Sequence, residues 1–331
     1  MNTRTEIFEA MDGRRGDSAP PAVFTQSATV SQMTPDASWP EAVFEADKMA
    51  ELSLQLSRRY GFATAKVPFC ITVETERAGA VIDGGSGDRQ PAVVDSPYYS
   101  DVFPDVPDFL PPEEFVSGGR CPVVREAAEL IRKRNDDLFL VTGTVDPFTV
   151  AYQLVGVENF LVGIMMEPDK AQAWVDALTP HIVENAKRLS EVSDDVQIIA
   201  EASEEILPPE YFEGIIGEPV RKVVSAVKCY STIHSCGETG SVLEELASLG
   251  ETGLSVETVS DPEEIYEKLS GKVRLLGGVS PVSGLMQGTP DEVRASARRY
   301  SEIGYDLITP ECGVPPTTPD ENLLALAHYR N

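Results

Sequence analysis

Short apolar stretches alternate with longer amphipathic stretches along most of the chain. Leu138–Val145 and Val196–Ala200 are apolar almost throughout, which is typical of strands in a parallel sheet that is covered on both faces. The longer stretches between them repeat apolar residues at helical spacing. The pattern predicts eight strands: Ala22–Thr25, Phe62–Phe69, Leu138–Val145, Val196–Ala200, Tyr230–His234, Gly253–Glu257, Val273–Gly277 and Asp306–Thr309.

Residues typical of helix N-termini support the helices that the pattern predicts between these strands. Thr289 with Glu292, and Thr318 with Glu321, have the spacing of a capping box, and each threonine is followed by a proline suited to the first helical turn. The predicted helices cover residues 41–60, 122–134, 168–192, 209–227, 241–250, 261–271, 289–304 and 318–330.

The alternation of strands and helices predicts an α/β fold, and eight repeats favour a (β/α)8 TIM barrel. An open, doubly wound sheet is the alternative. We expect one domain, residues 1–331, with an N-terminal helical extension over about residues 1–20. An insertion of about residues 84–118 follows the second predicted strand; it is rich in Gly, Pro and Asp, and Gln90–Val94 is a candidate hairpin strand.

Composition narrows the possible partners and location. The chain of 331 residues carries a formal net charge of −27 at pH 7, which disfavours nucleic acid and anionic membrane surfaces as partners. No apolar run approaches the ~18–20 residues of a membrane helix, and the N-terminus lacks the apolar core of a secretory signal. The five cysteines are an odd number and do not suggest a disulfide framework. We therefore expect a cytoplasmic protein.

The candidate chemistry lies where predicted strands end, which in a barrel is the end that carries the active site. His234 and Cys236 are two residues apart at the end of the fifth predicted strand, so their side chains point the same way. Cys312 follows the eighth predicted strand and Glu257 ends the sixth. Two thiolates, an imidazole and a nearby carboxylate are a plausible Zn²⁺ set, and three protein ligands with an open fourth position are typical of a catalytic site.

Each of these residues also has an ordinary interpretation. An isolated cysteine is most often an inert buried thiol, and we interpret Cys70, Cys121 and Cys229 in this way, although Cys70 also ends a predicted strand. A carboxylate at a strand end, such as Glu257, can simply cap a loop. Spacing alone therefore leaves the metal site and the ordinary interpretation both open.

A resemblance to a known family rests on several motifs. The stretches "HSCGETGSVLEELASLG", "LLGGVSPVSGLMQGTPDEV" and "GYDLITPECGVPPTTPDENLLAL" resemble the uroporphyrinogen decarboxylase superfamily. Within it, the chain is similar to the zinc-dependent methylcobamide:coenzyme M methyltransferases over nearly its whole length. The decarboxylases themselves carry an arginine-bearing segment near the N-terminus, whereas residues 20–33 here contain no arginine.

The resemblance implies a TIM barrel in which His234, Cys236 and Cys312 hold Zn²⁺. It implies that the metal binds a thiol, which takes a methyl group from the methylcobamide of a corrinoid protein. That protein is expected to dock at the C-terminal barrel face, and coenzyme M or another small thiol is the expected acceptor, in methanogenesis from methylated compounds. Two alternatives stay open: a corrinoid-dependent demethylase that works in the opposite direction, and a non-catalytic zinc-bearing partner of a corrinoid protein.

Two further assignments complete the expected site. Glu257 is the candidate catalytic carboxylate, either as the resting fourth zinc ligand or as an acceptor for the proton of the thiol. The sulfonate of coenzyme M needs hydrogen-bond donors, and the backbone amides around Gly277, Gly278 and Ser280 follow the seventh predicted strand, where barrels often bind anions.

Overall fold

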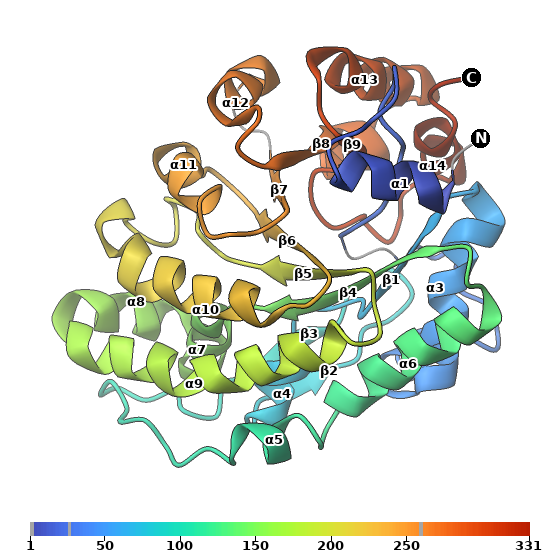
Figure 1. Cartoon of the computed structure of the whole chain (residues 1–331). Helices are drawn as coiled ribbons and strands as arrows, with labels where there is room; N and C mark the ends of the chain where they lie inside the picture. The colour runs from blue at the N-terminus through green and yellow to red at the C-terminus, as the bar shows by residue number, and fades with distance from the viewer. Residues whose placement is uncertain (1–2, 26–27, 258–260) are drawn as a thin grey trace.

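The computed structural model describes residues 3–25, 28–257 and 261–331, and its centre is a curled parallel sheet (Figure 1). The strand order β1-β4-β5-β6-β7-β8-β9 follows the order of the chain, which excludes the doubly wound alternative, in which the order reverses. All carboxyl ends meet at one end of the sheet, here called the mouth. The strands are β1 Thr64–Val67, β4 Phe139–Val145, β5 Asp195–Ile199, β6 Tyr230–Ser235, β7 Gly253–Val256, β8 Arg274–Val279 and β9 Leu307–Pro310.

The first of the eight predicted strands, Ala22–Thr25, closes the barrel without forming a regular strand. The Ala22 amide donates to the Ile308 carbonyl at 2.9 Å, but the Val23 amide donates to the Thr64 side chain, at 3.1 Å, instead of to the backbone of β1. Pro20 and Pro21 have no amide hydrogen, so the segment pairs with β9 through a single bridge. The prediction of eight strands is corrected to seven strands and a closing segment.

Helices surround the sheet, and most agree with the sequence pattern (Figure 1). The Thr289–Glu292 capping box is confirmed. The Thr318–Glu321 box is wrong, because Thr318 donates its amide to Pro315 in a turn and the following helix has Pro319 as its N-cap. The α-helices are α1 Arg4–Met11, α2 Glu41–Phe44, α3 Ala46–Tyr60, α4 Val73–Arg77, α5 Pro112–Phe115, α6 Cys121–Arg134, α7 Pro147–Val155, α8 Val157–Met166, α9 Pro168–Leu189, α10 Glu218–Ala226, α11 Leu243–Leu246, α12 Pro262–Leu269, α13 Pro290–Ile303 and α14 Asp320–Ala327. Short 3-10 helices are η1 Pro209–Tyr211 and η3 Gly240–Val242, and short π-helices are η2 Glu213–Gly217 and η4 Pro281–Met286.

The predicted extension and insertion both have regular structure. α1 lies within the N-terminal extension. In the insertion, β3 Ala92–Asp95 lies close to the predicted strand Gln90–Val94, and it forms an antiparallel hairpin with β2 Val81–Asp83, which lies just before the insertion. The rest of the insertion is anchored on α9, because the Trp174 indole donates to the Pro104 carbonyl at 2.9 Å and a His181 ring nitrogen lies 2.6 Å from the Leu110 carbonyl.

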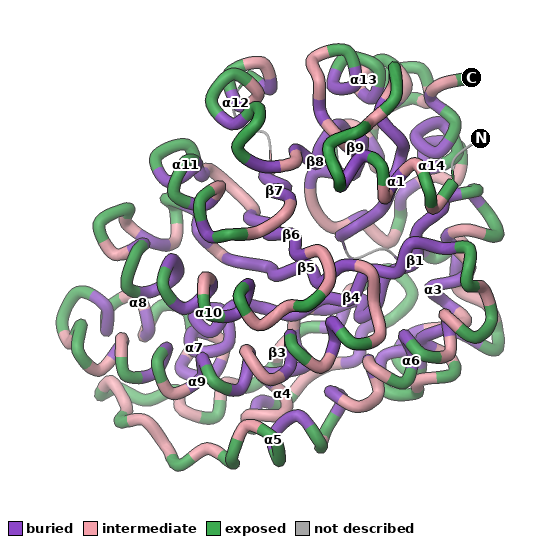
Figure 2. The backbone as a smooth tube through the Cα atoms, viewed as in Figure 1, coloured by how far each residue is buried: buried purple, intermediate pink, exposed green. Residues whose placement is uncertain are grey.

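The parallel strands are buried along almost their whole length (Figure 2). One apolar cluster lies between the sheet and the helices, and a second lies inside the barrel, where it includes Phe24, Phe139, Leu276 and Leu307. Among the described helices, none alone has the length and hydropathy of a membrane span; only α7 and α8 together reach them, as a pair bent by 107°.

Candidate metal centre

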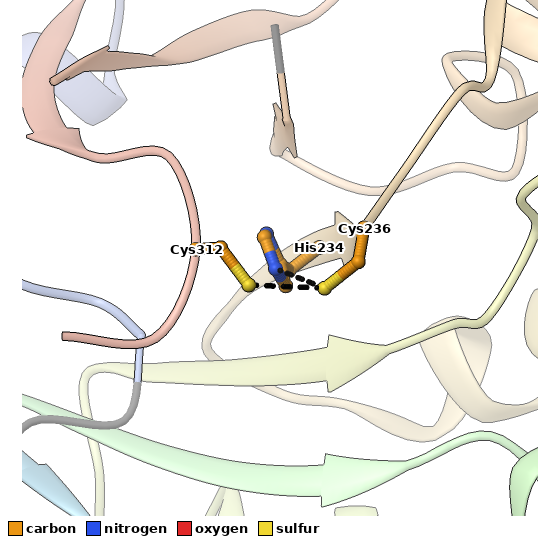
Figure 3. Close-up of side chains that lie close together, drawn as sticks. All are labelled: His234, Cys236 and Cys312. Carbon is orange, nitrogen blue, oxygen red and sulfur yellow. Dashed lines mark hydrogen bonds between the residues drawn. The ribbon is translucent and has the colours of Figure 1, made fainter. Parts of the chain in front are cut away.

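His234, Cys236 and Cys312 lie together at the mouth of the barrel (Figure 3). The Cys236 and Cys312 sulphur atoms are 3.1 Å apart, and Nε2 of His234 is 3.2 Å from the Cys236 sulphur. We call these three residues the triad. They come from two places in the chain, β6 and the segment directly after β9.

The strand geometry places the first two members of the triad. His234 and Cys236 share one side of the chain at the end of β6, while Ile233 belongs to the apolar cluster between sheet and helices. The His234 ring is almost fully buried, and its Nδ1 lies 3.1 Å from the Ser255 hydroxyl of β7. This contact fixes the ring orientation and leaves Nε2 facing the two sulphur atoms.

Cys312 is held in place by the segment that closes the barrel. The Thr25 hydroxyl donates to the Cys312 carbonyl at 2.9 Å, and the preceding residue, Glu311, donates its amide to the Val279 carbonyl of β8 at 3.0 Å. The Thr25 and Val279 contacts bring a sulphur atom 76 residues away in sequence to Cys236.

Of the three triad residues, Cys312 loses its proton easily, whereas Cys236 and His234 hold theirs. The hydrogen bond from Cys236 lowers the pKa of the Cys312 thiol to about 4 and raises that of Cys236. Burial alone lowers the pKa of His234, but the Cys312 thiolate and the carboxylates of Glu201 and Glu257 outweigh burial and raise it. One thiolate and its hydrogen-bond donors are therefore close together, and a divalent cation that replaces the shared protons would find its ligands already assembled.

The triad fits a zinc ion. Zinc prefers thiolate and imidazole ligands, and a tetrahedron with Zn–S distances of about 2.3 Å holds its sulphur atoms about 3.8 Å apart. The observed sulphur separation of 3.1 Å differs from this by less than one ångström, which a change in side-chain rotation accommodates. Within the described part of the chain, these three residues are the only group of His, Cys, Asp and Glu with potential ligand atoms this close together.

Glu257 lies beside the triad without belonging to it. Its carboxylate accepts a hydrogen bond from the Gly237 amide at 3.1 Å, so it caps the loop after β6. It also contributes to the electrostatic field at His234 and Cys236. The loop-capping interpretation therefore agrees with the geometry, while its role as a fourth ligand stays a prediction.

Sequence reasoning missed two residues of the site, Glu201 and Ser255. Glu201 follows β5 at the mouth, and burial raises the pKa of its carboxyl group despite an attractive interaction with His234. The signal was available, because Glu201 is a carboxylate directly after an apolar strand, as Glu257 is. Ser255 had no such signal, because only the strand register shows that it faces His234.

Of the three residues predicted to bind the sulfonate, two lie within β8 and one follows it. Gly277 and Gly278 lie inside β8, which extends two residues further than predicted and pairs with β9. Ser280 follows the strand, and its hydroxyl accepts a hydrogen bond from Ser283 at 2.9 Å. An anion-binding role for these residues stays a prediction.

Cys70 lies outside the triad. Arg120 donates a hydrogen bond to its sulphur at 3.2 Å, which agrees with a structural role.

Comparison with known proteins decides the family. The family model for uroporphyrinogen decarboxylase (URO-D) matches residues 2–331. The chain belongs to this family. It is 30% identical to the methylcobamide:CoM methyltransferase MtaA of Methanosarcina barkeri, over 99% of this chain and 97% of that protein. It is also 30% identical to a methylated-thiol--coenzyme M methyltransferase of Methanosarcina mazei, over 98% of this chain and 88% of that protein.

A solved structure of the family supports the fold directly. A methyltransferase from Methanosarcina mazei superposes with a TM-score of 0.92 at 32% identity, covering 100% of this chain and 98% of that one. The resemblance inferred from the sequence motifs and the barrel-type fold are both confirmed.

Proposed function

We propose that this protein is a methyltransferase that moves a methyl group from a methylcobamide to the thiol of coenzyme M. The observation that carries the proposal is the triad of two thiols and one imidazole at the mouth of the barrel. It occurs in a chain similar over its full length to proteins named methylcobamide:CoM methyltransferases. The triad indicates a reactive site, and the similarity to these proteins indicates a substrate, so the proposal needs both observations.

The reaction needs a thiolate, because a neutral thiol is a poor nucleophile near pH 7. His234, Cys236 and Cys312 would hold Zn²⁺, which supplies charge that favours the thiolate form of the substrate. The thiolate sulphur forms a bond to the methyl carbon, the cobalt–carbon bond breaks, and its electron pair stays on the corrinoid as cob(I)amide. The thiol proton leaves to solvent or to a nearby carboxylate, for which Glu257 is the nearest candidate predicted from the sequence.

A methylcobamide is large, so it has to approach the triad from the open end of the barrel. We infer that it arrives on a corrinoid protein that docks over the mouth, close to the carboxyl ends of β5 and β6. The barrel then needs only to align sulphur and methyl carbon, since much of the barrier to such a transfer is the cost of bringing two reactants together.

The test combines metal content with methyl transfer. The purified protein should contain about one Zn²⁺ per chain, and Cys236→Ala should lose it, whereas Cys229→Ala should keep it because Cys229 lies outside the triad. With methylcobalamin and coenzyme M, cob(I)alamin should appear as the thioether forms. 2-Mercaptoethanol, which lacks the sulfonate, should react more slowly at equal low concentration.

Three outcomes would contradict the proposal. Full zinc retention in Cys236→Ala would remove the metal assignment. Equal rates with the two thiols would remove coenzyme M as the acceptor. Transfer from a methylated substrate to cob(I)alamin, without the reaction toward coenzyme M, would identify the chain as a demethylase.

A further inference from the structure

The barrel interior between the apolar floor and the triad is polar. Strand register gives the side chains that face inward: Val141 pairs with Asp195, Gly143 with Gln197, and Gln197 with Thr232. Val141 belongs to the apolar floor inside the barrel, and Asp195, in register with it, is a polar side chain at the edge of this floor. The next inward residues along these strands form the layer above. His234 lies two residues beyond Thr232 on β6, which puts this layer about 7 Å below the triad.

The side chain of a lysine reaches into this layer from the floor below. Lys66 of β1 is 2% exposed, and it is the one lysine that is buried in the described part of the chain. Its amine lies where the side chain of Gly143 would otherwise be, because a Cβ atom on Gly143 would be 2.2 Å from Nζ. A side chain at position 143 would therefore force this amine to move.

Several polar atoms of the layer have no partner among the described residues. Thr232 donates to one oxygen of Asp195 at 2.8 Å, but the other oxygen, Oδ1, has no partner. We call Lys66, Asp195, Gln197, Thr232 and Thr309 the polar tier. Its fully buried atoms that lack a hydrogen bond are Lys66 Nζ, Asp195 Oδ1, Gln197 Oε1, Gln197 Nε2 and Thr309 Oγ1.

Unpaired groups of this kind are costly, and folded proteins normally satisfy them with enclosed water. The polar tier contains both donors and acceptors, which suits water better than an ion of either sign. An apolar ligand would leave every one of these atoms unsatisfied.

We propose that the polar tier encloses a small cluster of ordered water molecules, and that Lys66 is a positioning residue whose hydrated ammonium group favours thiolate binding at the triad above it. The first half of this inference is independent of the proposed function, and the second half rests on it.

The charges around Lys66 explain why water is needed. Burial lowers the pKa of Lys66 to about 7, opposed by the nearby groups of Asp195 on β5, Glu74 on α4 and Cys70 after β1. Burial likewise raises the pKa of Asp195 to about 8. Hydration restores part of the lost solvation of the ammonium group and keeps it charged. Without such hydration, the lysine would carry a charge only part of the time near neutral pH.

A positive charge below the triad acts on the substrate through the electric field. The site already holds two cysteines and the carboxylates of Glu201 and Glu257, and a thiolate with a sulfonate adds more negative charge. A unit charge about 10 Å away, at an effective dielectric constant of about 20, changes an equilibrium by about tenfold.

The first test is a high-resolution crystal structure of the wild-type protein. Separate density peaks should lie within hydrogen-bond distance of Lys66 Nζ, Asp195 Oδ1 and the Gln197 amide, and they should refine as water. A tier that is empty, or that holds a metal ion or an anion, would overturn the hydration proposal.

The second test measures the affinity for coenzyme M by calorimetry between pH 6 and pH 9. Lys66→Met should bind about tenfold more weakly at pH 7, and the acid limb of its pH profile should move up by about one unit. Lys228→Met removes the same charge from an exposed position, where Lys228 pairs with Glu191, and it should follow the wild type.

Lys66→Gln provides a second variant if the methionine variant folds poorly, and it should shift the profile in the same direction. An unchanged profile in a folded Lys66 variant, or an equal shift in Lys228→Met, would overturn the positioning role. If the wild type does not bind coenzyme M at all, the proposed function fails instead, while the crystal structure still tests the water cluster.

Discussion

Glu201 offers the clearest test of how individual charges act at the triad. It lies beside His234 but is not one of the three candidate ligands. Glu201→Gln should therefore keep the full zinc content, because all ligands remain. The affinity for coenzyme M at pH 8 should rise several-fold, because a like charge next to the anionic substrate is removed.

Metal analysis and calorimetry on the same preparation check both parts of this prediction. Glu257→Gln is the matched variant, since it removes the other carboxylate that acts on His234. Loss of zinc in Glu201→Gln would show that this carboxylate is a ligand, and an unchanged or weaker affinity would show that its charge does not reach the substrate.

The site residues differ in how far the sequence could reveal them. His234 and Cys236 were predictable because residues two apart in the sequence of a strand point to the same side. Cys312 was predictable because parallel strands end together at the mouth. Ser255 was not, because its contact depends on the register between β6 and β7. The polar tier was not either, since the contact of Lys66 with Gly143 depends on the register between β1 and β4.

At the scale of single elements, the capping box at the N-terminus of α13 allows a quantitative prediction of stability. Thr289 accepts a hydrogen bond from the Glu292 amide, and the Glu292 carboxylate accepts from the Thr289 amide at 2.8 Å. Thr289→Ala removes the side-chain half of this capping box. The free energy of unfolding should fall by about 1 kcal/mol, as measured by urea denaturation.

Thr5→Ala is the control for this measurement, because Thr5 is an exposed residue inside α1. It should stay within about 0.5 kcal/mol of the wild type. Equal effects of the two substitutions would mean that the capping bonds of Thr289 contribute nothing measurable.

Helices and central strands were largely predictable because their hydrophobic periodicity is local. The predictions were wrong where a contact with a distant part of the chain determines the local structure. The closing segment has the apolar composition of a strand, but its two prolines limit pairing to one bridge with β9. Thr318 has the right spacing for a cap, yet a turn with Pro315 uses its amide and shifts the helix start to Asp320.

The whole molecule has two electrostatic properties that affect its stability in different ways. Its surface carries the excess of acidic over basic residues that gives a net charge of −27, and this charge repels itself in the folded state. Its interior contains carboxyl groups that favour the protonated form, and burial raises the pKa of Asp146 to about 7.

The last prediction separates these two properties. A carboxyl group whose pKa is raised on folding holds its proton in the folded state between about pH 4 and pH 7, whereas the unfolded chain has released it. The free energy of unfolding should therefore fall as pH rises through this window, with a slope on the order of 1 kcal/mol per pH unit for Asp146. Asp146→Asn should reduce the slope between pH 5 and pH 7, and asparagine should still cap α7, where Asp146 accepts from the Thr149 amide at 2.7 Å.

Salt should act differently, because exposed carboxylates are already ionised at pH 5 and their repulsion is screened by ions. Raising NaCl from about 0.05 M to about 1 M should increase the free energy of unfolding at every pH in the window and leave the slope nearly unchanged. Urea denaturation of the wild type and of Asp146→Asn, each at both salt concentrations, gives four curves of the free energy of unfolding against pH. A slope that disappears in high salt would assign the pH dependence to the surface, and an unchanged slope in the variant would show that Asp146 is ionised in the folded protein.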